Sequence, residues 1–232
     1  MIYPLDQTKL ILSDEPLPFM VGQRDEIDRY WNGSLHRNNR LWNGDFFLFT
    51  DVKIVDRVIH GLGHKTDFST FLYWRDHGRD QCVTHITGTT FPHFDDGSLL
   101  AIKMADHTAN AGRVYFPAGA LDGDDIVDGA FDIGTNIRRE LMEEIGLDMQ
   151  DEWLSGPLLA SADDNAFHIT QTMRIPIGYE QLENDWKLHR ANGGDDEVEC
   201  LVPICHPDDI PLEMPTYAAA LCRYHFDKLE RR

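Results

Sequence analysis

Glu140, Glu143 and Glu144 are the residues of this chain whose types and spacing best suit chemistry. On a helix, side chains three and four residues apart are neighbours, so these carboxylates would gather on one side. Carboxylates this close repel one another and raise each other's pKa unless cations lie among them. Arg139 and Glu143 form the one favourable i, i+4 pair in the stretch. Clustered oxygen ligands suit Mg²⁺ or Mn²⁺, and a solvated helix face in an acidic chain is the alternative.

These glutamates lie in a predicted helix over residues 132–145. Ile137, Leu141 and Ile145 recur every four residues and form one apolar stripe along it. Before the helix, RVYF reads as a short strand that leads into PAGALDGDD, a loop rich in glycine and aspartate. Gly119 in this loop would let backbone groups approach a metal or a phosphate closely. A strand and a glycine-containing loop therefore precede the helix that carries the carboxylates.

Together with its flanks, the stretch resembles the Nudix box, G-x5-E-x7-R-E-U-x-E-E-x-G-U, in which U is aliphatic. The second half is matched at every defined position, by Arg139, Glu140, Leu141, Glu143, Glu144, Gly146 and Leu147. In the first half, Asp125 stands at the spacing of the family's first glutamate, counted from Gly119. Asp132 lies seven residues before Arg139 and can cap the helix. The six residues Ile126–Phe131 (IVDGAF) are therefore an insertion, which we expect to lengthen the loop, and the role of Asp125 stays open.

The resemblance implies hydrolysis of a nucleoside diphosphate linked to another group, X, with divalent ions holding the diphosphate. By matching position, Glu140, Glu143 and Glu144 would be metal ligands, and the Gly119 backbone would add a carbonyl. Glu140 would orient or deprotonate the attacking water, and Glu143 would act in catalysis beside it. Arg139 would position Glu140 by a charge-assisted hydrogen bond and, with Gly119, contact the substrate.

Many members of this family add one acidic residue from a distant loop. The stretch GGDDEVEC, residues 193–200, offers several carboxylates, of which Glu197 is the first choice as a metal ligand. A solvated loop is the alternative for each of them. Asp163 and Asp164 are competitors, and capping of a turn is the alternative for these two.

The formal net charge of −19 argues against a nucleic-acid backbone or an anionic membrane as partner, because both require clustered Lys and Arg. A phosphorylated small molecule can still bind if metal ions supply the positive charge. No stretch approaches the roughly 18 apolar residues of a membrane helix, and no secretory signal is recognisable. The four cysteines lack CxxC spacing, so buried thiols in a reducing, cytoplasmic setting are expected.

Strands and helices are mixed along the chain, which predicts the α/β class. The resemblance implies a Nudix-type α/β/α sandwich with a mixed β-sheet over residues 81–232. Residues 1–80 would form an α+β extension with a helix over 22–38 and strands over 45–52 and 52–63. Its second helix would be capped by Thr66 or Asp67. Trp31, Trp42, Phe71 and Trp74 would form the core of this extension, with base stacking as the alternative.

The substrate is read from the N-terminal region. NRLWNGDFFLF and GLGHKTDFSTFLYWRD resemble the region before the catalytic domain in UDP-glucose pyrophosphatase-like Nudix proteins. A nucleotide sugar such as a UDP-sugar is therefore the first expectation and ADP-ribose the second. A catalytically weak Nudix-fold sensor that binds a nucleotide is the alternative. The family often forms dimers, so a homodimer is also expected.

Overall fold

The computed structural model describes residues 2–230 of the chain. The helices are α1 (Pro18–Gly22), α2 (Arg24–Arg37), α3 (Phe68–Asp76), α4 (Ile133–Ile145), α5 (Tyr179–Ala191) and α6 (Thr216–Glu230). The strands are β1 (Ile2–Leu5), β2 (Gln7–Ser13), β3 (Asp45–Val55), β4 (Val58–Asp67), β5 (His85–His93), β6 (Leu99–Met104), β7 (Val114–Tyr115), β8 (Ala118–Ala120), β9 (Ile126–Val127), β10 (Ala130–Phe131), β11 (Leu158–Asp163), β12 (Ala166–Arg174) and β13 (Val198–Ile204). No helix in this range is both long enough and apolar enough to span a membrane.

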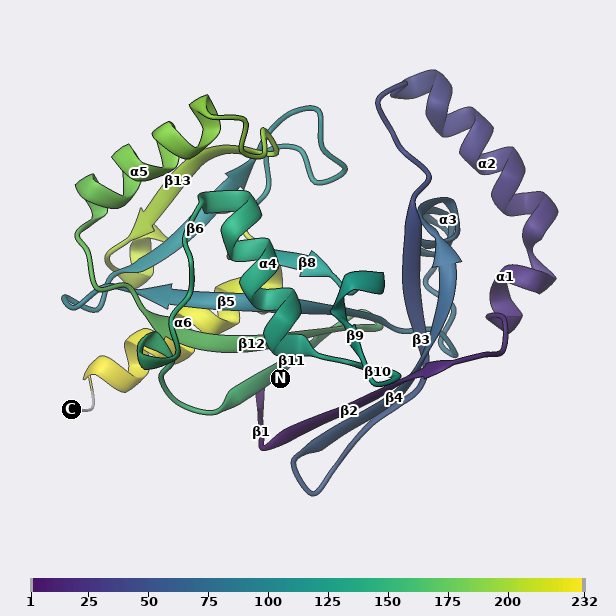
Figure 1. Cartoon of the computed structure of the whole chain (residues 1–232), viewed down its shortest axis with the longest axis horizontal. Coiled ribbons are helices and arrows are strands. Elements are labelled where there is room, and N and C mark those ends of the chain that lie inside the picture. Colours follow the sequence, from purple (N-terminus) through teal and green to yellow (C-terminus); the bar gives the residue numbers. More distant parts are fainter. Residues whose placement is uncertain (1, 231–232) are drawn as a thin grey trace.

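Eight of the described strands form a mixed sheet in the order β1-β11-β12-β5-β6-β13, with β8 beside β5 and β7 beside β6. Strands β12 and β5 run parallel. Gly88 of β5 faces α4, because a Cβ there would lie 2.1 Å from Asn136 Oδ1. Phe91, three residues on and therefore on the other face, contacts His225 of α6. Helices α4 and α6 thus cover opposite faces (Figure 1), and the expected α/β sandwich with a mixed sheet is confirmed.

The large sheet divides at the place where the candidate site lies. Strands β5 and β6 share one register pair, His93 with Leu99. Beyond it β8 pairs with β5, and β7 pairs with β6. The chain from β7 to β8 therefore carries Gly119 into the division, directly beneath α4.

A second sheet has the order β3-β4-β2-β10-β9 within residues 2–230. The expected strand over residues 52–63 is wrong, because Asp56 and Arg57 turn the chain between β3 and β4. Both residues have positive φ, 48° and 62°, as the tight turn of a hairpin requires. Helix α3 begins at Asp67, whose Oδ1 accepts the Thr70 N–H at 2.8 Å. Of the two expected caps, Asp67 is therefore the one used.

The two sheets exchange strands across the predicted boundary at residues 80/81. Strand β1 lies in the large sheet beside β11, whereas β9 and β10 lie in the small sheet beside β2. The expectation that Ile126–Phe131 only lengthens a loop is wrong, since these residues form the β9–β10 hairpin. Asp128 and Gly129 make its turn with φ of 51° and 78°. The division into residues 1–80 and 81–232 stays a prediction.

Candidate active site

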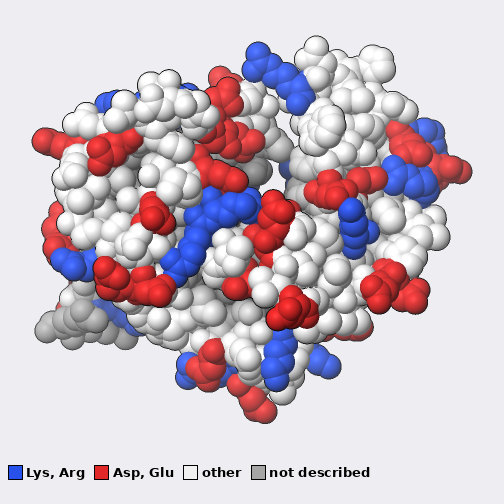
Figure 2. Space-filling model, viewed as in Figure 1, with Lys and Arg blue, Asp and Glu red and all other residues white. Residues whose placement is uncertain are grey.

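A cavity of about 620 Å³ lies between the large sheet and the elements from β2 to α3, which we call the N-terminal unit. Glu140, Glu144 and Gly119 line one wall, and side chains of α3 and β3, among them Phe46 and Phe71, line the opposite wall. Figure 2 shows a hollow between the surface over α4 and the surface over the segment that joins α2 to β3, with acidic side chains along its α4 side. The carboxylate helix and the N-terminal unit therefore face one another across a single cavity.

Helix α4 is fixed at both ends. Asp132 Oδ1 accepts the N–H groups of Gly134 and Thr135 at 2.8 and 3.3 Å. Gly146 ends the helix in the left-handed conformation, with φ of 70°. The expected apolar stripe of Ile137, Leu141 and Ile145 is buried. The predicted helix is confirmed.

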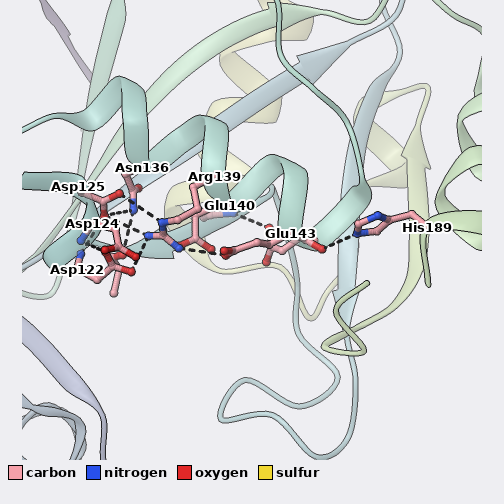
Figure 3. Close-up of polar contacts among 11 residues, drawn as sticks. Asp122, Asp124, Asp125, Asn136, Arg139, Glu140, Glu143 and His189 are labelled. Atoms are coloured by element: carbon pink, nitrogen blue, oxygen red, sulfur yellow. Dashed lines mark hydrogen bonds and ion pairs between the residues drawn. The ribbon is translucent and has the colours of Figure 1, made fainter. Parts of the chain in front are cut away.

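Arg139 lies among four carboxylates (Figure 3). Its Nη2 is 3.0 Å from Asp122 Oδ2 and 3.1 Å from Asp125 Oδ2. Its Nη1 is 2.7 Å from Glu140 Oε1 and 3.1 Å from Glu143 Oε2. Burial lowers the pKa of the guanidinium, but the hydrogen bond to Asp125 and the surrounding negative charges outweigh it and raise that pKa. Arg139 therefore stays charged and links the loop before α4 to the glutamates of α4.

Asp125 is fully buried, and its carboxylate is saturated with hydrogen bonds. Its Oδ2 accepts Asn136 Nδ2–H at 2.8 Å and the Asp122 N–H at 2.9 Å, in addition to Arg139. An unpaired buried carboxylate would cost several kcal/mol, so these partners fix its place. Asp125 therefore holds Arg139 in place.

Glu140 and Glu144 are the two carboxylates of α4 that line the cavity. Glu144 is 4% exposed, and its Oε2 accepts the Ala118 N–H at 3.0 Å. Burial and the charge of Glu140 raise the pKa of Glu144 well above its usual range. Burial raises the pKa of Glu140 to about 7 against the opposing charge of Arg139. Gly119 allows this packing, because a Cβ there would lie 1.8 Å from the Glu140 carboxyl carbon.

Of the other expected acidic residues, some line the cavity and some do not. Glu197 lines the same cavity as Glu140 and Glu144, at an exposed position before β13. The Glu143 carboxylate is 49% exposed and is bound by Arg139, outside the cavity lining. Asp163 lines the cavity, and its Oδ2 accepts the Thr216 hydroxyl at 2.9 Å. Asp164 has a φ of 43° in a turn and lies 3.2 Å from Arg79, as the turn interpretation expects.

Among residues 2–230, no three His, Cys, Asp or Glu side chains lie close enough together to form a ready-made metal-ligand set. The donor atoms nevertheless fit a hard divalent cation, since all of them are oxygens. Glu144 is buried and Glu140 is half-buried, burial is the main cause that raises the pKa of each, and a cation between the two would favour both charged forms. The Gly119 backbone lies against the Glu140 carboxylate and can add a carbonyl oxygen.

Two histidines that the sequence did not indicate line the cavity, His85 and His168. His168 stacks on Tyr217 with ring centroids 3.5 Å apart, and its Nδ1 is 2.8 Å from Thr87 Oγ1. Burial lowers the pKa of each imidazole to about 3, so both rings are neutral at physiological pH. A single histidine in a strand carries no signal of function. Only the parallel register of β5 with β12 brings these two together.

The rim of the cavity carries Arg40, Trp42 and Arg113. The expectation that Trp42 belongs to the core is wrong, because the side chain is 82% exposed. It lies in a segment without regular structure, where neither helix nor strand holds it against the interior. Trp74 is buried as expected. In the described part of this acidic chain, Arg40 and Arg113 form no ion pair, so their charges are available to a ligand.

No model of a known protein family matches the sequence, and no curated protein does. Several solved structures are similar to the chain. A NUDIX hydrolase from Nitrosomonas europaea is 16% identical with a TM-score of 0.42, and the match covers 62% of this chain and 89% of that one. For the MutT protein from Methanosarcina mazei Go1 the identity is 14%, the TM-score 0.45 and the coverage 64% and 96%. For the NUDIX domain of NrtR from Shewanella oneidensis, solved with ADP ribose, these values are 12%, 0.41, 64% and 88%.

Proposed function

We propose that this protein is a metal-dependent pyrophosphohydrolase of the Nudix type, which cleaves a nucleoside diphosphate linked to another group. The observation that carries the proposal is the arrangement around Arg139. The complete second half of the motif lies on a capped helix, with Arg139 held by Asp125 and directed at Glu140. Glu140 in turn lies against the Gly119 backbone at the wall of a cavity.

The roles follow from these contacts. Glu140, Glu144 and the Gly119 carbonyl would hold Mg²⁺ or Mn²⁺, and Glu197, which lines the same cavity from the loop before β13, would be a further ligand. When bound there, the ions would neutralise phosphate charge and lower the pKa of the attacking water. Glu140 orients that water or accepts its proton, and Arg139 fixes the Glu140 carboxylate. Glu143 supports Arg139 and is within reach of the ions only if its side chain turns away from that arginine.

The cavity supports a small nucleotide derivative as substrate. Its volume of about 620 Å³ falls in the range of sites for small molecules. The diphosphate would lie at Glu140 and Glu144, with Arg40 and Arg113 attracting its charge at the rim. The aromatic wall and the neutral histidines suit the uncharged ends of the molecule. We propose a nucleotide sugar as the first candidate and ADP-ribose as the second.

The alternative is a sensor that binds the nucleotide and cleaves it slowly or not at all. The observation in its favour is that the carboxylates do not form a ready-made ligand set and that Glu143 is turned toward Arg139. The observation against it is that no glutamate of the second half of the motif is replaced.

One panel of substrates separates the two functions. UDP-glucose, ADP-ribose, NADH, coenzyme A and diadenosine polyphosphates would each be incubated with the protein and Mg²⁺ or Mn²⁺, and products measured by chromatography. Cleavage of one compound, with roughly a hundredfold loss in Glu144→Gln, is expected. Tight binding of a compound without cleavage would establish the sensor. An unchanged rate in Glu144→Gln would remove Glu144 from the site.

The setting of the protein is part of the proposal. The four cysteines are free thiols, which suits a reducing, cytoplasmic environment, although the expectation that they are buried holds for Cys222 and is wrong for the exposed Cys82 and Cys205. A homodimer would be recognised by light scattering of the purified chain, and a monomeric mass would exclude it.

A further inference from the structure

The inserted β9–β10 hairpin stands between two residues that organise the candidate site. Asp125, which holds Arg139, comes directly before the hairpin, and Asp132, which caps α4, comes directly after it. The Asp132 N–H donates to the Asp125 carbonyl at 2.8 Å and closes the base of the hairpin. Any shift of the hairpin is therefore transmitted to both residues.

The other end of the hairpin belongs to the second sheet, β3-β4-β2-β10-β9, which we call the N-terminal sheet. The Leu12 N–H donates to the Gly129 carbonyl at 2.9 Å, and Ala130 pairs with Ile11 in antiparallel register. The insertion thus adds β10 and β9 to the edge of β2.

Phe131 anchors the hairpin. It is 3% exposed, and its ring lies edge-on to Phe47 at 5.0 Å and to Phe49 at 5.2 Å between centroids. Gly63 on β4 leaves room for it, since a Cβ there would lie 2.4 Å from Phe131 Cε2. Strands β3 and β4 therefore provide a fitted site for this one ring.

We propose that Phe131 is a positioning residue, which couples the N-terminal sheet to Arg139 through Asp125. The Asp125 carboxylate is buried and keeps its partners only while its backbone stays in place. Arg139 meets Asp125 with one side of its guanidinium and Glu140 with the other. Release of Phe131 moves Asp125, leaves Arg139 without its fixed partner and lets the Glu140 carboxylate turn. As far as turnover is concerned, this coupling rests on the proposed function.

A double-mutant cycle separates positioning from ordinary core packing. The variants are Phe131→Ala, Phe131→Leu, Asp125→Asn and the double variant of Phe131→Ala with Asp125→Asn. The matched control is Ile27→Ala, alone and with Asp125→Asn, because Ile27 is fully buried in α2 of the same N-terminal unit and lies outside the core cluster that contains Phe131. Both alanine variants remove buried apolar volume, and only one of them touches the hairpin.

We expect Phe131→Ala to lower kcat roughly 10- to 100-fold while KM changes little, and Phe131→Leu to restore most of it. With Asp125 already replaced by Asn, Phe131→Ala should lower kcat by no more than about twofold further. Ile27→Ala should leave kcat close to that of the natural protein in both backgrounds. A Phe131→Ala loss that multiplies in full with the Asp125→Asn loss would overturn the proposal.

Hydrogen exchange tests the same coupling without any substrate. Amides of residues 122–140 should lose protection in Phe131→Ala, and to a smaller extent in Phe131→Leu, whereas Ile27→Ala should leave their protection unchanged. Unchanged protection of residues 122–140 in both Phe131 variants would overturn the proposal. If the natural protein cleaves no compound, the proposed function fails, and this measurement still decides whether Phe131 controls the loop. If Phe131→Ala does not fold, Phe131→Leu carries both tests.

Discussion

At the scale of single residues, the site is organised around one cation surrounded by four anions. Arg139 contacts Asp122 and Asp125 on one side and Glu140 and Glu143 on the other. One positive charge cannot neutralise four carboxylates, so the cluster around Arg139 keeps a net negative charge, and it lies close to Glu144. This balance is the residue-scale reason to expect that divalent ions complete the site.

Gly119→Ala tests the contact between the loop and Glu140, the carboxylate that we propose to be catalytic. A methyl group at position 119 would lie 1.8 Å from the Glu140 carboxyl carbon and would displace that side chain. The displaced group is the flexible end of a glutamate, so the free energy of unfolding should change little while kcat falls roughly a hundredfold. Gly123→Ala in the same loop is the control, since no atom lies within 4 Å of a Cβ there. Equal activity in the two variants would contradict the assignment of Glu140.

His168→Phe tests recognition of the substrate by a neutral ring. Phenylalanine can keep the stack on Tyr217 but loses both ring nitrogens, including the one beside Thr87. We expect KM to rise roughly 5- to 50-fold with a smaller change in kcat, as the loss of a hydrogen bond in a cavity implies. Thr87→Val serves as a companion variant, because it removes the hydroxyl that holds the ring. Unchanged KM in both variants would place the substrate elsewhere in the cavity.

At the scale of elements, what the sequence predicts well is governed by local periodicity. Helix α4 and its buried stripe follow from the spacing of Ile137, Leu141 and Ile145, and the observed cap is Asp132. The sequence of the β9–β10 hairpin contains a turn pattern, the Asp128–Gly129 pair between apolar residues. Whether this pattern forms a hairpin depends on its pairing with Ile11, which is distant in the sequence. Pairings of that kind are set by tertiary packing rather than by local pattern.

The cap of α3 gives the protein a dependence of stability on pH. Burial acts to raise the pKa of Asp67, but hydrogen bonds from Ser69, Thr70 and Arg24 outweigh it and lower the pKa to about 2. A carboxyl with a lowered pKa in the folded state stabilises the protein above its ordinary pKa of about 4. This stabilisation is lost as the pH falls toward about 2, because the unfolded chain then binds the proton more readily.

Asp67→Asn should therefore lower the free energy of unfolding by about 1 kcal/mol at pH 7 and flatten its change between pH 4 and pH 2. Urea unfolding at several pH values measures both effects. Replacement of the exposed Asp14 by Asn provides the control, and the same acid dependence in Asp67→Asn as in the natural protein would refute the role of the cap.

At the scale of the whole molecule, the formal charge of −19 and the carboxylates of the cavity both favour the binding of cations. Cation binding at Glu140 and Glu144, as proposed, would stabilise the folded state because the unfolded chain offers no such site. Mg²⁺ or Mn²⁺ at about a hundred times its Kd should raise the Tm by roughly 5–10 °C, and EDTA should reverse the rise. Sodium chloride at equal ionic strength should not reproduce it. A similar rise in Glu144→Gln would show that the ions act through surface charge alone.

The exchange of strands between the two sheets also decides the order in which the molecule can be completed during synthesis. Strands β3 and β4 leave the ribosome long before Phe131. The site formed by Phe47, Phe49 and Gly63 therefore stays exposed until the Phe131 ring can pack into it. Strand β1 likewise has no neighbour until β11 has been made. Strand β1 thus depends on residues translated much later, and the N-terminal sheet becomes a finished surface only when the half that carries the candidate site has emerged.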